Sequence, residues 1–512
     1  METKPTRTPE STFSEFGFRD TLEALIAEVQ QLYKVDQIPW VVGYSGGKDS
    51  TATLQLVWLS LQQLPSNERT KPVHVISTDT LVENPIVSAW VGRSLRRINE
   101  QAKEQGLPIT SHQLNPQVED TFWVNLIGRG YPAPGVKFRW CTERMKIRPA
   151  NRFISEMVKQ NGEAILVLGT RKAESSKRKH RMVKLEGKRI RDRLSPNLSL
   201  PNSLVYSPIE DWTNDDVWLF LMQTPNPWGH NNKELLTMYQ GASADGECPL
   251  VLDTSTPSCG DSRFGCWVCT LVDKDKSMSA MIQNDQEKEW MLPLLDLRDK
   301  LKEADRTTRD FRRMQGQVQI FHGEPIPGPY TQKARETWLR ELLTSQEWIR
   351  EHGPEHVRDL QLITLPELQE IRRIWVVDKH EFEDSLPRIY LETTKREYPG
   401  VPLHEHSAFG AAEAKLLQDA CGDDPIHFEM MRELIDTEQR HRNMARRAGL
   451  FDKLESAIRR SFYESAEDAK QRALRRKSAK DNPISVHARD EPHQQGLSLK
   501  PQAEESSRPT DA

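Results

Sequence analysis

Short apolar runs alternate with amphipathic stretches in the first half of the chain. The runs predict buried strands, because a strand covered on both faces needs apolar side chains in succession. They lie at residues 40–43, 73–77, 109–114, 165–169 and 204–206. Intervening windows such as residues 51–63 and 85–105 have the period of a helix with one buried face. This β-α-β alternation predicts an α/β fold, with a parallel, doubly wound sheet and helices on both of its faces.

The pattern changes after about residue 273, where charged helix formers dominate and strand-like runs become rare. We therefore expect a mainly helical C-terminal domain. Both ends of the chain have few large apolar side chains, so they cannot bury enough surface to offset the entropy lost on ordering. The predicted organisation is a flexible segment at 1–15, the α/β domain at 16–230, a cysteine-rich metal-cluster segment at 231–275, the helical domain at 276–465 and a disordered tail at 466–512.

Composition and charge limit the number of domains, the location and the partners that we expect for the protein. A chain of 512 residues is too long for one compact core, which agrees with several domains. It has no run of 18 apolar residues and no signal-peptide layout, so we expect a cytoplasmic protein with no membrane partner. The net charge of −4 neither requires nor excludes nucleic acid. Residues 171–193, where Lys and Arg greatly outnumber Asp and Glu, are a candidate DNA surface or an ordinary solvated loop.

A glycine-rich turn joins the first predicted strand to its helix, which we expect to begin at Thr51. The turn reads Tyr44-Ser45-Gly46-Gly47-Lys48-Asp49-Ser50. A strand, a turn and a helix N-terminus together present free backbone N–H groups and a positive dipole end to an anion. The glycines permit close approach of a phosphate, and the serines and lysine add donors. A Walker A loop would need Gly at position 42 and Ser or Thr at position 49, where this chain has Val42 and Asp49.

Two further segments follow predicted strands and support a nucleotide site at this edge of the sheet. Ser77-Thr78-Asp79-Thr80 follows the second strand, and Gly169-Thr170-Arg171 follows a later one. We expect Asp79 to help hold Mg²⁺, Arg171 to contact the phosphates and Gly169 to lie under the base or ribose. Each segment alone is also compatible with a helix cap or a surface charge. The predicted catalytic residues are Lys48, Asp49, Asp79 and Arg171.

The cysteines form a second candidate site. Four of the six lie close together in the sequence, at Cys248, Cys259, Cys266 and Cys269. Without a secretion signal a disulfide framework is not expected. Cys266 and Cys269 place two thiolates in one tight turn, and Cys141 with Cys248 or Cys259 would complete a set of four. Four thiolates suit either Zn²⁺ or an iron–sulfur cluster, and their spacing does not separate the two.

The sequence SGGKDS at residues 45–50 resembles, residue for residue, the phosphate loop of the ATP pyrophosphatase (PP-loop) superfamily. The resemblance implies that the loop grips the β- and γ-phosphates while ATP is cleaved between α and β, so that AMP passes to an acceptor. Over residues 37–225 the chain looks most like the phosphoadenosine-phosphosulfate (PAPS) reductase branch. The shared segments include Trp140-Cys141-Thr142, Gly169-Thr170-Arg171 and Pro208-Ile209. The reductases' Glu-Cys-Gly-Leu-His segment is missing, which disfavours simple PAPS reduction.

In place of that segment the chain has other cysteine motifs. They are Cys248-Pro249, Pro257-Ser258-Cys259-Gly260 and Gly265-Cys266-Trp267-Val268-Cys269. With Phe122-Trp123-Val124-Asn125 and the helical C-terminal part, they resemble the DndC family of DNA phosphorothioation sulfurtransferases over residues 20–460. This resemblance implies ATP-dependent replacement of a non-bridging DNA phosphate oxygen by sulfur, with a cysteine desulfurase and other phosphorothioation proteins as partners. It also implies a [4Fe–4S] cluster on Cys141, Cys248, Cys266 and Cys269, with Cys259 as a competitor.

Three functions remain open from the sequence. The first is the DNA sulfur-modification enzyme, and the second is a PP-loop enzyme of sulfonucleotide reduction or tRNA thiolation. The third is a nucleotide-binding subunit without catalytic activity. The missing reductase segment argues against sulfonucleotide reduction, and the intact loop with Asp79 and Arg171 argues against the third function. We therefore expect the first.

Overall fold

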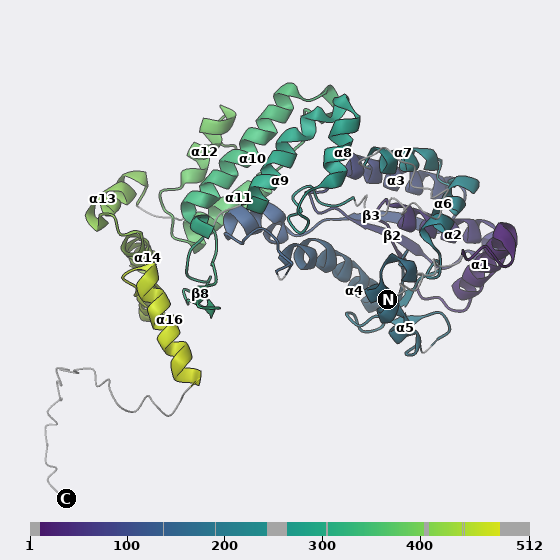
Figure 1. Ribbon diagram of the computed structural model, residues 1–512, viewed down its shortest axis with the longest axis horizontal. Helices are drawn as coiled ribbons and strands as arrows, with labels where there is room; N and C mark the ends of the chain where they lie inside the picture. Colours follow the sequence, from purple (N-terminus) through teal and green to yellow (C-terminus); the bar gives the residue numbers. More distant parts are fainter. Residues whose placement is uncertain are drawn as a thin grey trace, which may run out of the picture.

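The computed structural model describes residues 11–136, 138–189, 191–242, 264–303, 306–403, 409–442, 444 and 446–481. Within these ranges the molecule is elongated, with a sheet-containing part at one end and a helical part at the other (Figure 1). Cys248 and Cys259 lie outside the described residues. No helix in the described part of the chain has the length and apolar character needed to cross a membrane.

The main sheet has six strands in the order β3-β2-β1-β4-β6-β5. Their bounds are β1 (Trp40–Gly43), β2 (Val73–Thr78), β3 (Ile109–Leu114), β4 (Ala164–Val167), β5 (Ser195–Pro196) and β6 (Ser203–Tyr206). All neighbours are parallel except β5, which pairs antiparallel with β6 at the edge. In the register Trp40 lies opposite Val73 and Ile165. The predicted parallel sheet is confirmed, with a short antiparallel strand added to it.

Helices cover both faces of this sheet. They are α1 (Gly17–Lys34), α2 (Lys48–Gln62), α3 (Pro85–Glu104), α4 (Arg148–Asn161), α5 (Ser176–Glu186), α6 (Asn214–Gln223) and α7 (Asn232–Gly241). Successive residues of β1 point to opposite faces. Val42 belongs to the large core that includes residues of α1, α2, α3 and α6, whereas Val41 packs in a smaller core with Ile154 of α4. The doubly wound arrangement follows from this alternation.

The C-terminal part is helical, as the sequence predicts. Its helices are α8 (Lys276–Asn284), α9 (Leu292–Glu303), α10 (Gln332–His352), α11 (Leu365–Arg373), α12 (Ser385–Thr394), α13 (Ala411–Cys421), α14 (Pro425–Arg442), α15 (Leu450–Ser461) and α16 (Ala466–Asp481). A small hairpin of β7 (Ile320–Phe321) and β8 (Glu324–Pro325) interrupts them. Helix α16 corrects the expectation of disorder from residue 466 onward. Its buried Ala469 and Ala473 pack with Val318. These side chains are too small to produce a clear apolar pattern in the sequence.

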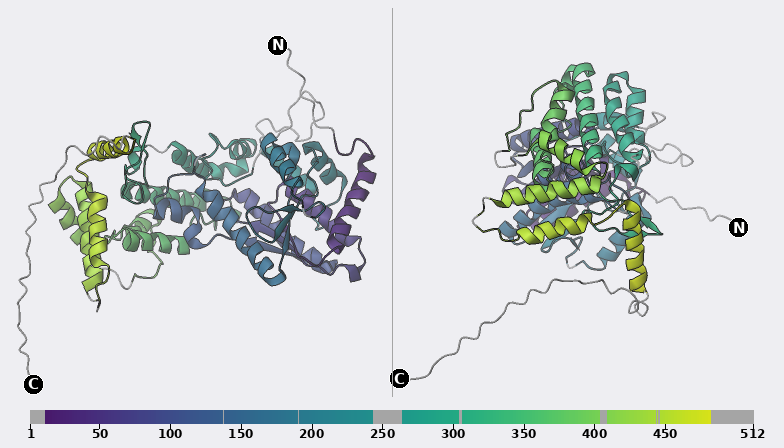
Figure 2. Two further views of the ribbon diagram at one scale, coloured as in Figure 1. Left: turned by 90° about the horizontal axis from the view of Figure 1, so that it is seen from below. Right: turned by 90° about the vertical axis from the view of Figure 1, so that its left-hand side faces the viewer.

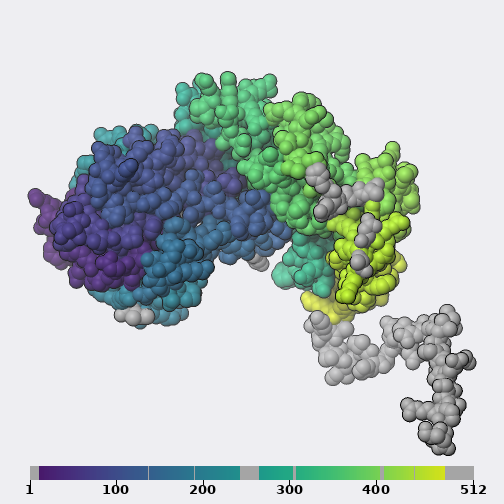
Figure 3. Space-filling model, turned by 180° about the vertical axis from the view of Figure 1, so that it is seen from behind, coloured from purple at the N-terminus to yellow at the C-terminus, as the bar shows by residue number. Residues whose placement is uncertain are grey.

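The two parts of the molecule share a hydrophobic core. Phe122, Trp123 and their neighbours come from the sheet-containing part, yet they pack in one cluster with α9, α10 and α11. The indole of Trp123 donates a hydrogen bond to the Leu362 carbonyl at 2.8 Å, and that of Trp375 donates to Ile127 at 3.0 Å. Figures 2 and 3 show the two parts as lobes in contact. The core therefore crosses the predicted domain boundary.

Candidate nucleotide and cysteine site

The phosphate loop lies between β1, which ends at Gly43, and α2, which begins at Lys48. The helix therefore starts three residues earlier than the predicted Thr51. This places Lys48 in the first helical turn, beside the positive end of the helix dipole. Gly46 has φ +74°, and a Cβ there would lie 2.5 Å from Val91 Cγ2 of α3. Both the backbone conformation and the neighbouring helix thus require glycine at this position.

Hydrogen bonds within the loop fix its shape. The Ser50 hydroxyl accepts from the backbone N–H of Ser45 at 3.2 Å and donates to the carbonyl of Gly47 at 3.0 Å. The indole of Trp90, on α3, donates to the Gly46 carbonyl at 3.1 Å. The loop is therefore held in shape by the protein itself, which reduces the cost of ordering it around a phosphate.

Tyr239 of α7 also supports the loop, and no local sequence motif pointed to it. Its hydroxyl accepts a hydrogen bond from the backbone N–H of Lys48 at 3.3 Å. Its ring packs edge-on against Phe264, with centroids 4.6 Å apart. Burial raises the pKa of the Tyr239 phenol, so the hydroxyl stays protonated at neutral pH. Tyr239 thus joins the phosphate loop to the chain that leads into the cysteine turn.

A chain of ion pairs begins at the loop and ends at a buried arginine. Lys48 Nζ lies 2.9 Å from Asp49 Oδ2, and Asp49 Oδ1 lies 2.6 Å from Arg171 Nε. The guanidinium of Arg171 also donates to the Trp212 carbonyl at 3.2 Å, and the side chain is only 4% exposed. Asp49 therefore links the two cations that the sequence assigned to the phosphates. The strongly buried arginine holds this carboxylate in place.

Gly169 marks a close approach between two elements. A Cβ on Gly169 would lie 2.6 Å from the carbonyl oxygen of Asp49 and 2.9 Å from Thr53 Oγ1. The end of β4 therefore lies directly against the first turn of α2. Glycine is needed here because backbone, not a flexible side chain, would meet the added atom.

Asp79 follows β2, as predicted, and lines the same cavity as the loop. Its two carboxylate oxygens accept from the Leu81 N–H at 2.8 Å and from the Gln113 side chain at 2.9 Å. Burial raises the pKa of Asp79, and the nearby Glu83 carboxylate adds to the rise. Each oxygen has a second lone pair, so the residue can still bind a cation. A carboxylate with these properties fits Mg²⁺.

One cavity of about 1150 Å³ brings the predicted nucleotide residues together. Its lining includes Tyr44, Ser45, Gly47, Lys48, Asp49, Ser50, Asp79, Gly169 and Arg171. The Gly46 carbonyl accepts the hydrogen bond from Trp90, which holds this part of the loop in place. The volume suffices for a nucleotide with space left for a second substrate. The cavity is also lined by Glu83 and Lys146, which interact with Cys266.

The cysteine turn is fastened to the segment after β2. The backbone of Cys266 pairs with that of Glu83, and the Trp267 N–H donates to the Val82 carbonyl at 3.0 Å. The Cys269 N–H donates to the Cys266 carbonyl at 3.0 Å, which closes the tight turn that the spacing predicted. Cys141 lies just before a π-helix (Thr142–Ile147) and interacts electrostatically with Cys269. The structure thus brings together all three described cysteines of the predicted set.

Lys146 connects the thiols with the nucleotide cavity. Its ammonium lies 3.2 Å from Glu83 Oε1, and the Cys266 thiol lies 3.7 Å from the same oxygen and 3.3 Å from Thr80 Oγ1. Burial and the Glu83 carboxylate raise the pKa of Cys266 to about 12. Burial acts against the charge of Lys146, but Cys266 and Glu83 raise its pKa overall. No role for Lys146 was predicted from the sequence.

The described residues alone do not form a metal site. Among them, no three Cys, His, Asp or Glu side chains are arranged to hold a metal ion. Cys141, Cys266 and Cys269 supply soft thiol donors, which suit iron–sulfur or zinc chemistry. The fourth ligand expected from the sequence, Cys248 or Cys259, lies outside the described residues. The four-cysteine ligand set therefore stays a prediction.

Comparison with known proteins identifies the first part of the chain. Residues 39–228 match the model of the phosphoadenosine phosphosulfate reductase domain. An uncharacterized protein of Methanocaldococcus jannaschii is 25% identical over 203 residues, which are 40% of this chain and 35% of that protein. The chain thus spans about a third of this curated relative's length.

Solved structures give more distant matches. The PAPS reductase of Candida auris, in a phosphate complex, is 13% identical with a TM-score of 0.26, over 41% of this chain and 89% of that chain. The U34-tRNA thiolase NcsA of Methanococcus maripaludis with its [4Fe-4S] cluster is 13% identical with a TM-score of 0.26, over 55% and 81% of the two chains. The match of residues 39–228 and the phosphate loop within it identify this part of the chain as a PAPS reductase domain of the PP-loop superfamily.

Proposed function

We propose that this protein is an ATP-dependent sulfurtransferase that activates a backbone phosphate of DNA by adenylation. One observation carries the proposal: a single cavity is lined both by the phosphate loop and by Glu83 and Lys146, which interact with the Cys266 thiol. An enzyme that joins ATP chemistry to sulfur chemistry needs both groups within reach of one substrate. This cavity meets that requirement.

The first step of the proposed reaction is nucleotidyl transfer. A non-bridging oxygen of the acceptor phosphate attacks the α-phosphorus of ATP, the bond to the β-phosphate oxygen breaks, and pyrophosphate leaves. The loop N–H groups and Lys48 stabilise the charge that develops on pyrophosphate. Arg171 keeps Asp49 in position through their 2.6 Å contact. Mg²⁺ held by Asp79 would neutralise phosphate charge when bound.

The second step replaces oxygen by sulfur. A sulfide-level nucleophile attacks the acceptor phosphorus, and AMP departs with the oxygen that was adenylated. A cysteine desulfurase is the proposed source of this sulfur, which it delivers as a persulfide. A second thiol, from an added thiol reductant, attacks the inner persulfide sulfur, forms a disulfide with it and releases sulfide. Other phosphorothioation proteins would select the DNA site. A [4Fe–4S] cluster on Cys141, Cys248, Cys266 and Cys269 would supply sulfur or electrons. Lys146, which lines the cavity and interacts with Cys266, would bind the anionic acceptor.

Helix α5 supports DNA as the acceptor. Ser175 and Arg178, at its start, line the nucleotide cavity. The helix and the turn after it carry exposed cations with no ion pair to any described residue, at Lys177, Lys179, Arg181, Lys184 and Lys188. Exposed cations in a row suit the repeated phosphates of a nucleic acid backbone, whereas a small sulfonucleotide has no use for them. A tRNA acceptor would use the same surface and remains the second candidate.

The proposal is tested by direct detection of the product. Anaerobically prepared protein is incubated with ATP, Mg²⁺, duplex DNA, cysteine, a cysteine desulfurase and dithiothreitol as the thiol reductant. The digested DNA is then analysed by mass spectrometry for phosphorothioate dinucleotides. We expect these dinucleotides with wild type and with Lys333→Ala, which changes an exposed lysine on α10. Lys48→Ala should abolish them. Thiolated tRNA in a parallel reaction, without modified DNA, would support the second candidate instead.

A further inference from the structure

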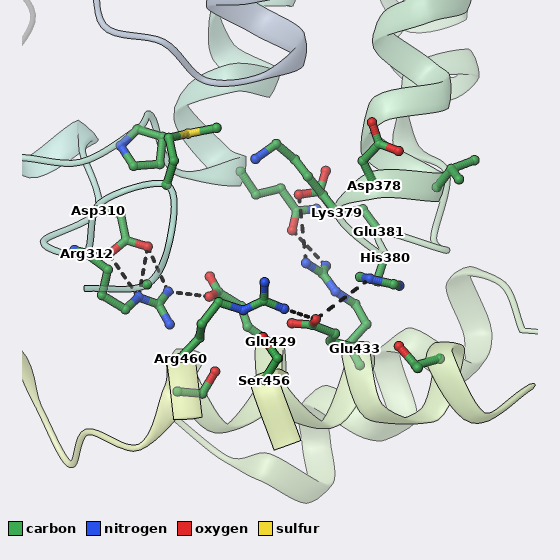
Figure 4. A pocket seen from close by; sticks show the side chains of 18 of the residues that line it. Asp310, Arg312, Asp378, Lys379, His380, Glu381, Glu429, Glu433, Ser456 and Arg460 are labelled. Atoms are coloured by element: carbon green, nitrogen blue, oxygen red, sulfur yellow. Dashed lines mark hydrogen bonds and ion pairs between the residues drawn. The ribbon is translucent and has the colours of Figure 1, made fainter. Parts of the chain in front are cut away.

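A second cavity lies in the helical part of the molecule, away from the phosphate loop. It has a volume of about 680 Å³ and shares no lining residue with the nucleotide cavity. Its walls are α10, α14 and α15 and two loops at residues 310–316 and 377–381 (Figure 4). Such a volume is typical of small-molecule sites. Nothing in the proposed sulfur chemistry uses it.

Arginines in and around this cavity are already paired with carboxylates. The pairs are Arg312 with Asp310 and Glu429, Arg335 with Glu381, Arg432 with Glu383, Arg440 with Asp436, and Arg460 with Glu433. The side chains of Arg335 and Glu381 are both at least 95% buried, so their charges depend on each other. Figure 4 shows several of these pairs converging around one space. The carboxylates are therefore engaged by guanidinium groups.

Three of the cations that line the cavity, Arg313, Lys379 and Lys453, have no ion pair with any described residue. Lys379 directly follows the π-helix Ile374–Asp378. Burial lowers the pKa of Lys379 to about 8, and the neighbouring guanidinium of Arg335 adds to the fall. The facing carboxylates of Glu381, Glu429 and Asp310 only partly oppose it. The Lys379 side chain is partly buried and has no counterion at ion-pair distance among the described residues, so its charge is poorly compensated.

We propose that this cavity binds a small phosphorylated anion, with the Lys379 ammonium at the centre of the site. The anion would supply the missing counterion, and the surrounding arginines offer further N–H donors with the planar geometry that suits phosphate oxygens. A cavity enclosed by three helices and two loops admits a small molecule more readily than a duplex. Pyrophosphate, a free nucleotide and a DNA phosphate share the required chemistry, and competition separates them.

Replacement of Lys379 by methionine removes the ammonium group with little change in side-chain length. No carboxylate loses an ion-pair partner in this variant. Because a partly buried charge without a counterion opposes folding, we expect Lys379→Met to melt at the same temperature as wild type or higher. Lys333→Met is the matched control, since Lys333 is exposed on α10 and does not line the cavity.

The test is isothermal titration with inorganic pyrophosphate. We expect Lys379→Met to bind one equivalent fewer than wild type, and Lys333→Met to bind as many as wild type. Lys48→Ala, which changes the phosphate loop, should keep the Lys379-dependent equivalent, so that failure of the ATP site is recognised separately. Displacement of pyrophosphate by ATP identifies a nucleotide site, whereas displacement by a short duplex alone identifies a DNA phosphate. Unchanged stoichiometry in Lys379→Met would overturn the proposal.

Discussion

Substitution of alanine for Gly169 tests the contact on which the geometry of the phosphate loop depends. The added Cβ would lie 2.6 Å from the carbonyl oxygen of Asp49 and 2.8 Å from its carbonyl carbon. Thr53 Oγ1 would lie 2.9 Å away on the same helix. Because two of these atoms are backbone, the clash cannot be relieved by a rotamer change. The first turn of α2 must move.

The size of the effect follows from this movement. Overpacking of a well-packed site costs about 1–3 kcal/mol. The displaced turn carries Asp49, which contacts both Lys48 and Arg171. If ATP binding must restore the original geometry, this cost is subtracted from the binding free energy. ATP affinity then drops by about 5- to 140-fold, at roughly 1.4 kcal/mol for each factor of ten.

The assay is isothermal titration of ATP with Mg²⁺, together with thermal denaturation. Gly92→Ala is the control, because a Cβ at Gly92 of α3 would meet only Arg96 Nη1, at 3.9 Å. That variant should bind ATP as wild type does and gain roughly 0.5–1 kcal/mol of stability from its higher helix propensity. Wild-type ATP affinity in Gly169→Ala would refute the assignment of this strand end to the nucleotide site.

Three further predictions concern the charges of the molecule. Glu381→Gln leaves the Arg335 guanidinium buried without its counterion, so the free energy of unfolding measured in urea should fall by about 3–5 kcal/mol. Lys177→Ser with Lys179→Ser should weaken duplex binding and reduce the slope of log K against log salt by about 1.8, from roughly 0.9 for each lost phosphate contact. Pyrophosphate binding at Lys379 should weaken as pH rises through about 8, because the folded-state pKa lies there and the charged form binds. In Lys379→Arg the charge persists, so that loss above pH 8 should disappear.

Each of these predictions has an internal control. Lys333→Ser with Lys415→Ser removes two exposed cations from the helical part, and the salt dependence of DNA binding should not change. An equal loss in both double variants would show that net charge, not α5, governs binding. For Glu381→Gln, unchanged stability would contradict the dependence of the buried arginine on its carboxylate. A pH profile shared by wild type and Lys379→Arg would assign the titration to another group.

Local patterns predicted the sheet and the phosphate loop well. The apolar run at residues 40–43 coincides with β1, because it is bounded by a proline on one side and by the polar loop on the other. The loop residues, Asp79 and Gly169 meet in one cavity because the carboxyl ends of parallel strands share one edge. These features depend on short stretches of sequence and on a general rule of topology.

Long-range contacts were beyond the reach of such patterns. Tyr239 lies 191 positions from Lys48, and no periodicity or motif connects them. Trp123 lies in the predicted α/β domain by its sequence position, but it packs in the core formed with α9, α10 and α11. A large apolar side chain can be buried in either of two adjacent cores, so its sequence position does not specify which one. Helix α16 was not predicted because its buried apolar side chains, among those that the structure describes, are small alanines. In each case the partner is set by the fold, and the local sequence does not encode it.

The central claim is that the loop at residues 45–50 cleaves ATP between its α- and β-phosphates to activate an acceptor. The most direct measurement is chromatographic analysis of the nucleotide products formed from ATP in the presence of DNA, the sulfur source and Mg²⁺. The account predicts AMP and pyrophosphate in equal amounts, dependent on DNA and lost in Lys48→Ala. Formation of ADP and inorganic phosphate by the wild-type protein would contradict it.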